Sequence, residues 1–265
     1  MTGAGPALSA AAGVVYALIL SPIVVVLLLA FSADNFILFP PSGYSLRWFI
    51  QLAANGPLLN ALLLSAQIAV AVTALSLLIG VPAALALAKG GFRGAEAMKS
   101  FFLAPLLLPT LIIGLALLLA FTPLRLTATL PGLALGHMTI TLPFVIRMMT
   151  TAFAAMPDDI EAAAATLGAS PRRVIRRVTL PLAAPGLIAC AALSFLLSFD
   201  ETVISLFLSG PRAATLPVEM VRYVEGRTDP LIAALSMVLI VGTLVIVVLV
   251  ERLVGVARAF GNERS

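Results

Sequence analysis

MPDDIEAAAATLGASPRRVIRRVTLP, residues 156–181, is a charged segment with helical patterning that lies between apolar stretches long enough to cross a bilayer. We call it the polar loop. Membrane spans made mostly of hydrocarbon side chains do not need such a segment for solubility. It is therefore best explained as a contact surface for a soluble partner.

The first half of the polar loop predicts a short amphipathic helix. Pro157 suits a first helical position, and Asp158 and Asp159 place negative charge where the helix dipole favours it. One apolar stripe then follows at spacings of three and four residues. Its members are Ile160, Ala163, Ala164 and Leu167. Gly168 is expected to end this helix.

The second half predicts another helix after a turn. Ser170 is a natural N-cap, and Pro171 behind it suits the first helical position. At about 100° per residue, the arginines fall in one arc and the apolar residues in the opposite one. The first set is Arg172, Arg173, Arg176 and Arg177, and the second is Val174, Ile175 and Val178. We expect the apolar face to pack and the arginine face to be wet or partnered.

The polar loop resembles the EAA loop of the membrane subunits of binding-protein-dependent ABC importers. That pattern is Glu-Ala-Ala, three residues, Gly, nine residues, then Ile-x-Leu-Pro. Gly168 is followed by nine residues and then by Val178, Thr179, Leu180 and Pro181, with Val in place of Ile. The family's Glu position holds Ala162, and Glu161 stands one place early. One residue rotates a helical side chain by about 100°, which leaves open whether Glu161 takes the family role.

The resemblance implies an all-α membrane protein: six transmembrane helices in the type I ABC importer permease fold, with a cytoplasmic coupling-helix loop. It also implies a second permease subunit, two ATPase subunits that bind ATP and Mg²⁺, and a periplasmic or lipid-anchored solute-binding protein. The ATPase-coupling residues would be Glu161, Ala162, Ala163, Ala164, Gly168, Ala169, Ser170, Pro171, Leu180 and Pro181.

Three further stretches resemble the second permease of the spermidine/putrescine subfamily. They are LAKGGFRG (Leu87–Gly94), HMTITLPFVIR (His137–Arg147) and SFDETVISLFLSGPRAATLPVEMVRYV (Ser198–Val224). This resemblance covers nearly the whole chain and implies a polyamine as the solute. Phosphonates, amino-acid derivatives and ferric ion remain open, as does pairing with an identical or a distinct permease.

Composition alone points to the membrane. Hydrophobic residues make up 61% and charged residues 11% of the chain, and the mean hydropathy is +1.13, unlike a soluble globular chain. Stretches of about 20 apolar residues can cross a bilayer. We predict spans at about 10–31, 58–88, 101–121, 133–155, 182–209 and 230–250, within a single transmembrane domain covering residues 1–265.

The distribution of Lys and Arg predicts the orientation, since cytoplasmic loops collect these residues. With both termini inside, ten lie in inner segments and five in outer segments, leaving aside Arg147 within a span. This places the polar loop in the cytoplasm of a bacterial inner-membrane protein. The Ala-Phe-Ser-Ala sequence at 30–33 resembles a signal cleavage site. We expect a retained span instead, because a basic n-region is missing and the apolar stretch is too long.

Motifs for intrinsic catalysis are missing from the sequence. The string nearest to a phosphate-binding loop, Gly94–Ser100, lacks the second Gly that lets backbone N–H groups close on phosphates. The single histidine, His137, is expected to be a structural hydrogen-bonder, and the single Cys190 excludes an intrachain disulfide. We therefore expect no enzyme activity, no cofactor and no metal in this chain.

Asp200 and Glu201 are the candidate residues for the translocation path. Ionisable groups at bilayer depth are costly and usually face a polar cavity or a partner. If the fifth helix starts at Leu182, Asp200 lies about 27 Å along it, and only one of the two carboxylates faces a central path. A packing role for both stays open. Arg147, near the inner end of the fourth span, is expected to snorkel.

Two alternatives compete with an importer subunit. A stand-alone ion-gradient-driven secondary transporter would have similar spans but no ATPase partner. A DNA-binding helix-turn-helix would also place arginines on a helix pair, but spans directly on both sides of the polar loop argue against any nucleic-acid partner. We therefore predict the permease subunit of an ATP-driven importer, with lipid around it.

Overall fold

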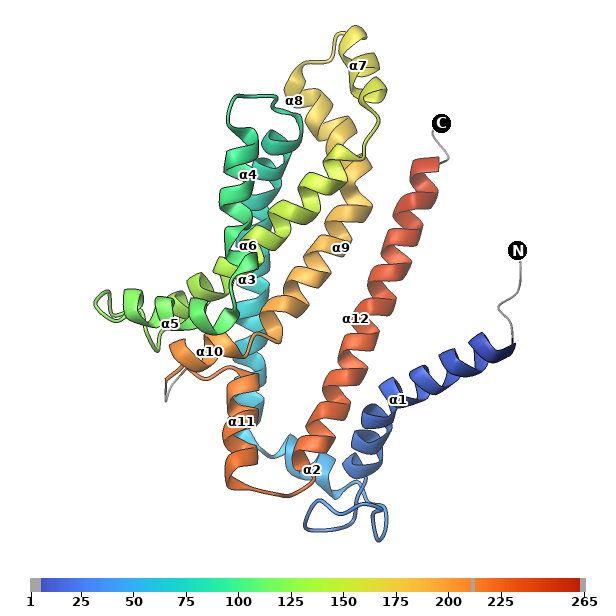
Figure 1. The fold of residues 1–265 in the computed structure, drawn as a ribbon, viewed down its shortest axis with the longest axis vertical. Coiled ribbons are helices and arrows are strands. Elements are labelled where there is room, and N and C mark those ends of the chain that lie inside the picture. The colour runs from blue at the N-terminus through green and yellow to red at the C-terminus, as the bar shows by residue number, and fades with distance from the viewer. Residues whose placement is uncertain (1–5, 211–212, 263–265) are drawn as a thin grey trace. The chain divides into compact units, whose positions relative to one another are not determined.

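The computed structural model describes residues 6–210 and 213–262, and its regular secondary structure is helical (Figure 1). The helices are α1 Pro6–Ala30, α2 Arg47–Ala53, α3 Gly56–Lys89, α4 Ala95–Leu103, η1 Ala104–Leu107, α5 Thr110–Phe121, α6 Leu130–Ala154, α7 Asp158–Thr166, α8 Pro171–Val174, η2 Ile175–Thr179, α9 Leu180–Phe199, α10 Val203–Leu208, α11 Leu216–Gly226 and α12 Leu231–Asn262. The chain divides into two compact units, Met1–Asn60 with Met220–Thr243 and Ala61–Glu219 with Leu244–Ser265.

Within the described residues, five helices are long and apolar enough to cross a membrane. They are Leu8–Ala30, Gly56–Lys89, Leu130–Ala154, Pro171–Phe199 and Leu231–Gly255. A bent pair of helical segments, Ala95–Leu107 and Thr110–Phe121, brings the number to six if the pair counts as one span. The predicted all-α membrane fold is confirmed.

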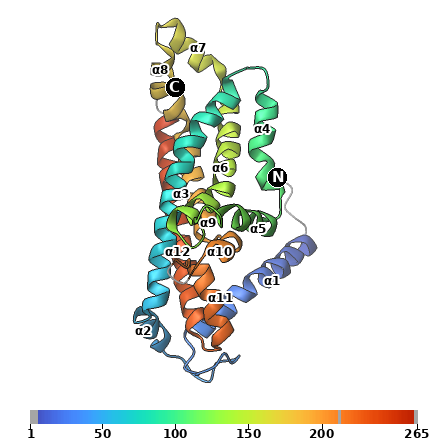
Figure 2. The ribbon, with the colours of Figure 1, turned by 90° about the vertical axis from the view of Figure 1, so that its left-hand side faces the viewer.

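The predicted third span, at 101–121, is strongly bent. The chain bends by 99° between Ala95–Leu107 and Thr110–Phe121. Pro105 lies in the 3₁₀ turn η1, and Pro109 has extended backbone angles immediately before α5. Proline has no N–H to donate and disfavours the helical conformation in the residue before it, which explains a break here. Figure 2 shows α5 lying across the direction of α4.

The fifth span differs from its predicted bounds of 182–209 at both ends. It begins at Pro171, so the second half of the polar loop continues directly into the bundle. The Leu180 N–H bonds to the Ile175 carbonyl, which makes η2 one turn of π-helix immediately before Pro181. A proline ring clashes with the carbonyl four residues back in an α-helix, and a wider turn accommodates it. The helix then ends at Phe199, and residues 203–208 form the separate α10.

Two apolar clusters hold the larger unit together. One joins α3, α5, α6 and α10 through Val72, Ile113, Leu133 and Ile204. The other joins α3, α6 and α9 through Ala84, Val145, Met149, Phe153, Ala183 and Cys190. Gly136 allows the close approach of α6 and α10, since a Cβ there would lie 2.4 Å from Leu208 Cδ1.

The smaller unit contains the segment between α1 and α3. Residues 47–53 form α2, and the Arg47 guanidinium lies 4.4 Å from the centroid of the Trp48 ring. Arg47 also donates hydrogen bonds to the Asp34 carbonyl at 2.8 Å and to Asn35 Oδ1 at 2.6 Å. The Ile37 N–H bonds to the Thr228 carbonyl, so this loop is tied to the segment before α12.

His137 is the polar centre of the larger unit. Its ring nitrogens lie 3.0 Å from Ser198 Oγ and 2.9 Å from Ser205 Oγ, and all three side chains are buried. The histidine therefore links α6 to α9 and α10, which agrees with the predicted structural role.

Replacing His137 with leucine should lower the stability of the fold. Leucine fills a similar volume but leaves the buried hydroxyls of Ser198 and Ser205 without their partner. Each unsatisfied hydroxyl should lower the free energy of unfolding by about 1–3 kcal/mol. The measurement is the thermal unfolding midpoint of the purified protein in detergent. Thr139→Ala on the same helix is the control, because the Thr139 hydroxyl bonds only to its own helix at Leu135. An unchanged midpoint for His137→Leu would contradict the linking role.

Candidate functional site

The polar loop forms the predicted pair of helices. In Figures 1 and 2, α7 and α8 lie beyond the ends of α3, α6 and α9. Pro157 is the N-cap of α7, so the helix begins at Asp158, one residue later than predicted. Ser170 and Pro171 begin α8 as predicted, although the Ser170 side chain makes no capping hydrogen bond.

Gly168 makes the turn between the two helices. Its φ is +80°, in the left-handed region that side chains disfavour. The Gly168 N–H bonds to the Ala165 carbonyl at 2.9 Å, and the Ala169 N–H bonds to the Ala164 carbonyl at 3.1 Å. These two bonds form a Schellman motif, which satisfies the last carbonyls of α7.

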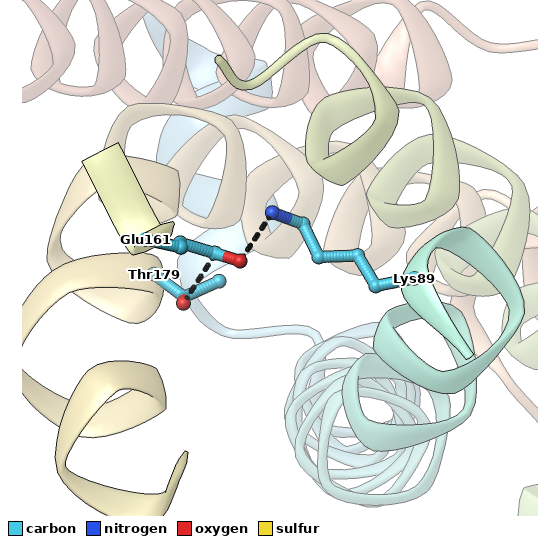
Figure 3. A network of polar contacts seen from close by, with 3 residues as sticks. All are labelled: Lys89, Glu161 and Thr179. Atoms are coloured by element: carbon cyan, nitrogen blue, oxygen red, sulfur yellow. Dashed lines mark hydrogen bonds and ion pairs between the residues drawn. The ribbon is translucent and has the colours of Figure 1, made fainter. Parts of the chain in front are cut away.

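Glu161 ties the polar loop to the bundle. One carboxylate oxygen lies 2.7 Å from Lys89 Nζ at the end of α3, and the other accepts a hydrogen bond of 2.6 Å from the Thr179 hydroxyl (Figure 3). Thr179 belongs to the π turn η2 and is buried. A single carboxylate therefore joins three elements: α3, α7 and the start of the fifth span.

This contact shifts the titration of Glu161. Partial desolvation raises the pKa of the carboxyl. The hydrogen bonds from Lys89 and from the Thr179 hydroxyl, together with the charge of Lys89, outweigh this effect and hold the pKa below the ordinary 4.5. Because the pKa of Glu161 is lower in the folded state than in the unfolded state, the contact contributes fully to stability at a pH above the unfolded-state pKa. This contribution is lost as the pH falls below about 4.5 and through the folded-state pKa.

Space remains under the loop around this contact. A cavity of about 320 Å³ is lined by Lys89, Glu161 and Thr179 together with apolar side chains such as Leu85 and Val174. Ala169 and Pro171 border the same cavity. The loop is therefore not packed tightly on the bundle, and the carboxylate bridges the gap.

The apolar stripe of α7 points away from the protein. Leu167 is 90% exposed and Ile160 is 42% exposed, and Ala163 is exposed as well. In the second helix Val174 is buried and the four arginines are exposed, as predicted, but Ile175 is 38% exposed. The prediction that Ile175 packs is therefore wrong: Ile175 is the first residue of the π turn η2 and borders the open cavity.

Other members of the predicted coupling set lie on both halves of the loop. Ala162 is exposed and Ala164 is half-buried, while Leu180 and Pro181 lie in the first turn of α9. Sequence reasoning missed Lys89 and Thr179 as partners of Glu161. Lys89 is the first charge after the long apolar run of the second span, and that position was the available signal.

Asp200 and Glu201 lie at a break between helices, not inside the fifth span. Asp200 follows the last residue of α9 and is exposed. Glu201 is only 8% exposed, and its Oε1 accepts a hydrogen bond of 2.9 Å from the Ile204 N–H. The Glu201 carboxylate therefore satisfies the N-terminus of α10. The expectation that Asp200 lies along a continuous helix is wrong, because α9 ends at Phe199.

Comparison with known proteins identifies the family. Residues 76–258 match the family described as "Binding-protein-dependent transport system inner membrane component". The chain belongs to this family. It is therefore a permease subunit of the kind found in ABC importers. This membership favours the importer subunit over the ion-gradient-driven secondary transporter.

The relatives are named for transport systems of different solutes. The chain is 31% identical to the spermidine/putrescine permease PotC of Haemophilus influenzae, covering 89% of this chain and 91% of the relative. It is 35% identical to the putrescine permease PotI of Escherichia coli K12, covering 78% of this chain and 75% of the relative. It is 34% identical to a putative 2-aminoethylphosphonate permease, PhnV, of Salmonella paratyphi A, covering 92% of this chain and 94% of the relative.

Solved structures agree on the fold. A bacterial ABC transporter for alginate import has a chain with a TM-score of 0.69 and 15% identity, covering 92% of this chain and 94% of that chain. An inward-facing methionine ABC transporter has a chain with a TM-score of 0.64 and 19% identity, covering 76% of this chain and 95% of that chain. At these identities the likeness concerns the fold alone.

Reversing one charge of the Glu161 contact should release the loop. Glu161→Lys or Lys89→Glu places like charges face to face, so that amide hydrogen exchange across residues 156–181 should accelerate. Exchanging both residues should restore protection. The control is Glu96→Lys, because the Glu96–Lys99 pair spans 3.8 Å with Glu96 87% exposed and such surface pairs contribute little. Unchanged exchange in both single variants would show that the contact does not hold the loop.

Proposed function

We propose that the polar loop is the surface on which a cytoplasmic ATPase subunit docks, and that this docking drives import. The observation that carries the proposal is the exposed apolar stripe of α7. Leu167 and Ile160 stand uncovered in a segment otherwise rich in charge. Exposed apolar side chains rimmed by charged residues are typical of protein interaction sites. Membership in an importer family supports an ATPase as the partner.

Movement of the loop would reach the bundle by two routes. The chain stays helical from Pro171 through the π turn η2 to Phe199, so a push on α8 would move the fifth span. The Glu161 contact connects α7 to the end of α3 at Lys89. Both spans pack on α6 through one buried cluster. A shift at the loop would thus change how three helices pack. Alternating access requires an element of this kind, with two alternative packings.

The complete transporter would contain more than this chain. We propose two ATPase subunits that bind ATP and Mg²⁺, a second permease, and a periplasmic or lipid-anchored solute-binding protein. This chain would then need no nucleotide site or cofactor of its own. Both termini and the polar loop would face the cytoplasm, as the distribution of Lys and Arg predicts.

We propose a polyamine as the solute. PotC and PotI support it, since both carry the name of a polyamine transport system. Asp200 is the proposed carboxylate of the path, because it is exposed while Glu201 is engaged by the backbone of α10. A negative charge at the end of α9 suits a cationic solute.

The turn at Gly168 offers a sharp test of docking. Gly168→Val puts a side chain on a left-handed residue at a cost of about 1–2 kcal/mol, in a place where a Cβ meets no other atom within 4 Å. Gly168→Asn fills the same open space but tolerates this conformation. We expect ATPase-subunit retention during purification to fall about five- to thirtyfold for Val and to stay near normal for Asn.

Equal retention of the ATPase by the Val and Asn variants would contradict a role for the turn. Unfolding midpoints of both purified variants serve as the control, since the substituted side chain is exposed and the bundle should be unaffected.

The solute can be tested with the complete transporter in vesicles. Labelled spermidine and putrescine should be taken up in an ATP-dependent manner and should raise ATP hydrolysis, while 2-aminoethylphosphonate should not compete. Asp200→Asn should reduce polyamine uptake while leaving basal ATP hydrolysis unchanged. Uptake of 2-aminoethylphosphonate in place of polyamines would overturn the solute proposal and leave the docking proposal intact.

A further inference from the structure

A second polar site lies between α4 and α6, away from the Glu161 contact. It is a pocket of about 460 Å³ lined by Lys99 and Leu103 of α4 and by residues of the last turns of α6. The α6 residues include Ile146, Arg147 and Thr150. The chain continues from Ala155 directly into the polar loop, so the pocket lies at the loop end of the bundle.

The pocket has unbalanced positive charge. Both charged residues that line it are basic, Lys99 and Arg147. In the part of the chain that the structure describes, Arg147 makes no ion pair, and Lys99 has only the long 3.8 Å contact to the exposed Glu96. Two cations facing one cavity repel each other, and an anion between them would remove this cost.

The same pocket contains an unsatisfied hydroxyl. Thr150 is 5% exposed, and its Oγ1 is buried with no hydrogen-bond partner in the described residues. Threonine hydroxyls in helices usually bond to a carbonyl one turn back, as Thr151 does to Arg147. A free donor beside two basic side chains is suited to phosphate oxygens.

The surroundings of the pocket are those of a membrane surface. Arg147 lies seven residues before the end of α6, which is about 10 Å along the helix and within reach of the headgroup layer by snorkelling. The pocket is also lined by apolar side chains, those of Leu103, Ile146, Ala154 and Ala155. Such side chains suit acyl chains, whereas a soluble anion would gain nothing from them.

We propose that this pocket binds the phosphate group of an anionic phospholipid. Lys99 and Arg147 would supply the charge, Thr150 the hydrogen bond, and the apolar side chains of the pocket the contact with the start of the acyl chains. Basic pockets between transmembrane helices on the cytoplasmic side are a known setting for anionic headgroups. A lipid held here would stand beside the segment that joins α6 to the polar loop.

The test uses the complete purified transporter with phosphatidylglycerol and phosphatidylcholine as probes, and native mass spectrometry to count bound lipids. We expect phosphatidylglycerol to be retained preferentially. Lys99→Gln and Arg147→Gln should each weaken that binding about fivefold, and the double variant about twenty-fivefold. Arg147→Lys should keep most of the binding, and Arg93→Gln, a charge removal in the exposed α3–α4 loop, should change nothing.

Three results would overturn the proposal. Equal binding of the two lipids would show that charge is not recognised, and unchanged preference in the double variant would place the site elsewhere. Inorganic phosphate that displaces phosphatidylglycerol as effectively as the lipid itself would assign the pocket to a soluble anion. Thermal unfolding midpoints confirm that the variants fold, and the binding measurement requires no transport, so it stands apart from the docking proposal.

Discussion

The contact of one carboxylate with Lys89 and Thr179 is the constraint on which the polar loop depends. The loop otherwise stands over a cavity, with its apolar stripe and its arginines exposed. Glu161 is the point at which α7 is held to α3 and to the first residues of the fifth span. The strength of such a contact comes from its partial shielding from water and from the buried hydroxyl, since fully exposed ion pairs contribute little.

The displaced position of Glu161 has a physical meaning in this arrangement. A shift of one residue turns a helical side chain by about 100°. Here the Glu161 carboxylate reaches Lys89, whereas Ala162 at the family position is exposed. The exposed face of α7 is then left apolar, with Ile160 and Ala163 beside Leu167. In this chain the acidic residue holds the loop, and the apolar residues form the proposed docking surface.

Local patterns in the sequence predicted much of this structure. Apolar run lengths located the spans, and Gly168, Ser170 and Pro171 located the turn of the polar loop because each has a strong conformational preference. The bend in the third span had a signal in Pro105 and Pro109, but its angle depends on how α5 packs against α10. The partners of Glu161 could not be predicted, because Lys89 comes from a distant helix and Thr179 is positioned by a π turn. The break at Asp200 was missed because the apolar run continues past it to residue 208.

The central claim is that the exposed face of α7 is covered by an ATPase subunit in the working transporter. The most direct measurement is maleimide labelling of Leu167→Cys in a Cys190→Ser background, with and without the ATPase subunits; native Cys190 is fully buried. Leu124→Cys serves as a reference, since Leu124 is 64% exposed and lies outside the polar loop. Assembly should protect position 167 and leave position 124 reactive. Equal labelling of position 167 in the presence and absence of the ATPase would contradict the account.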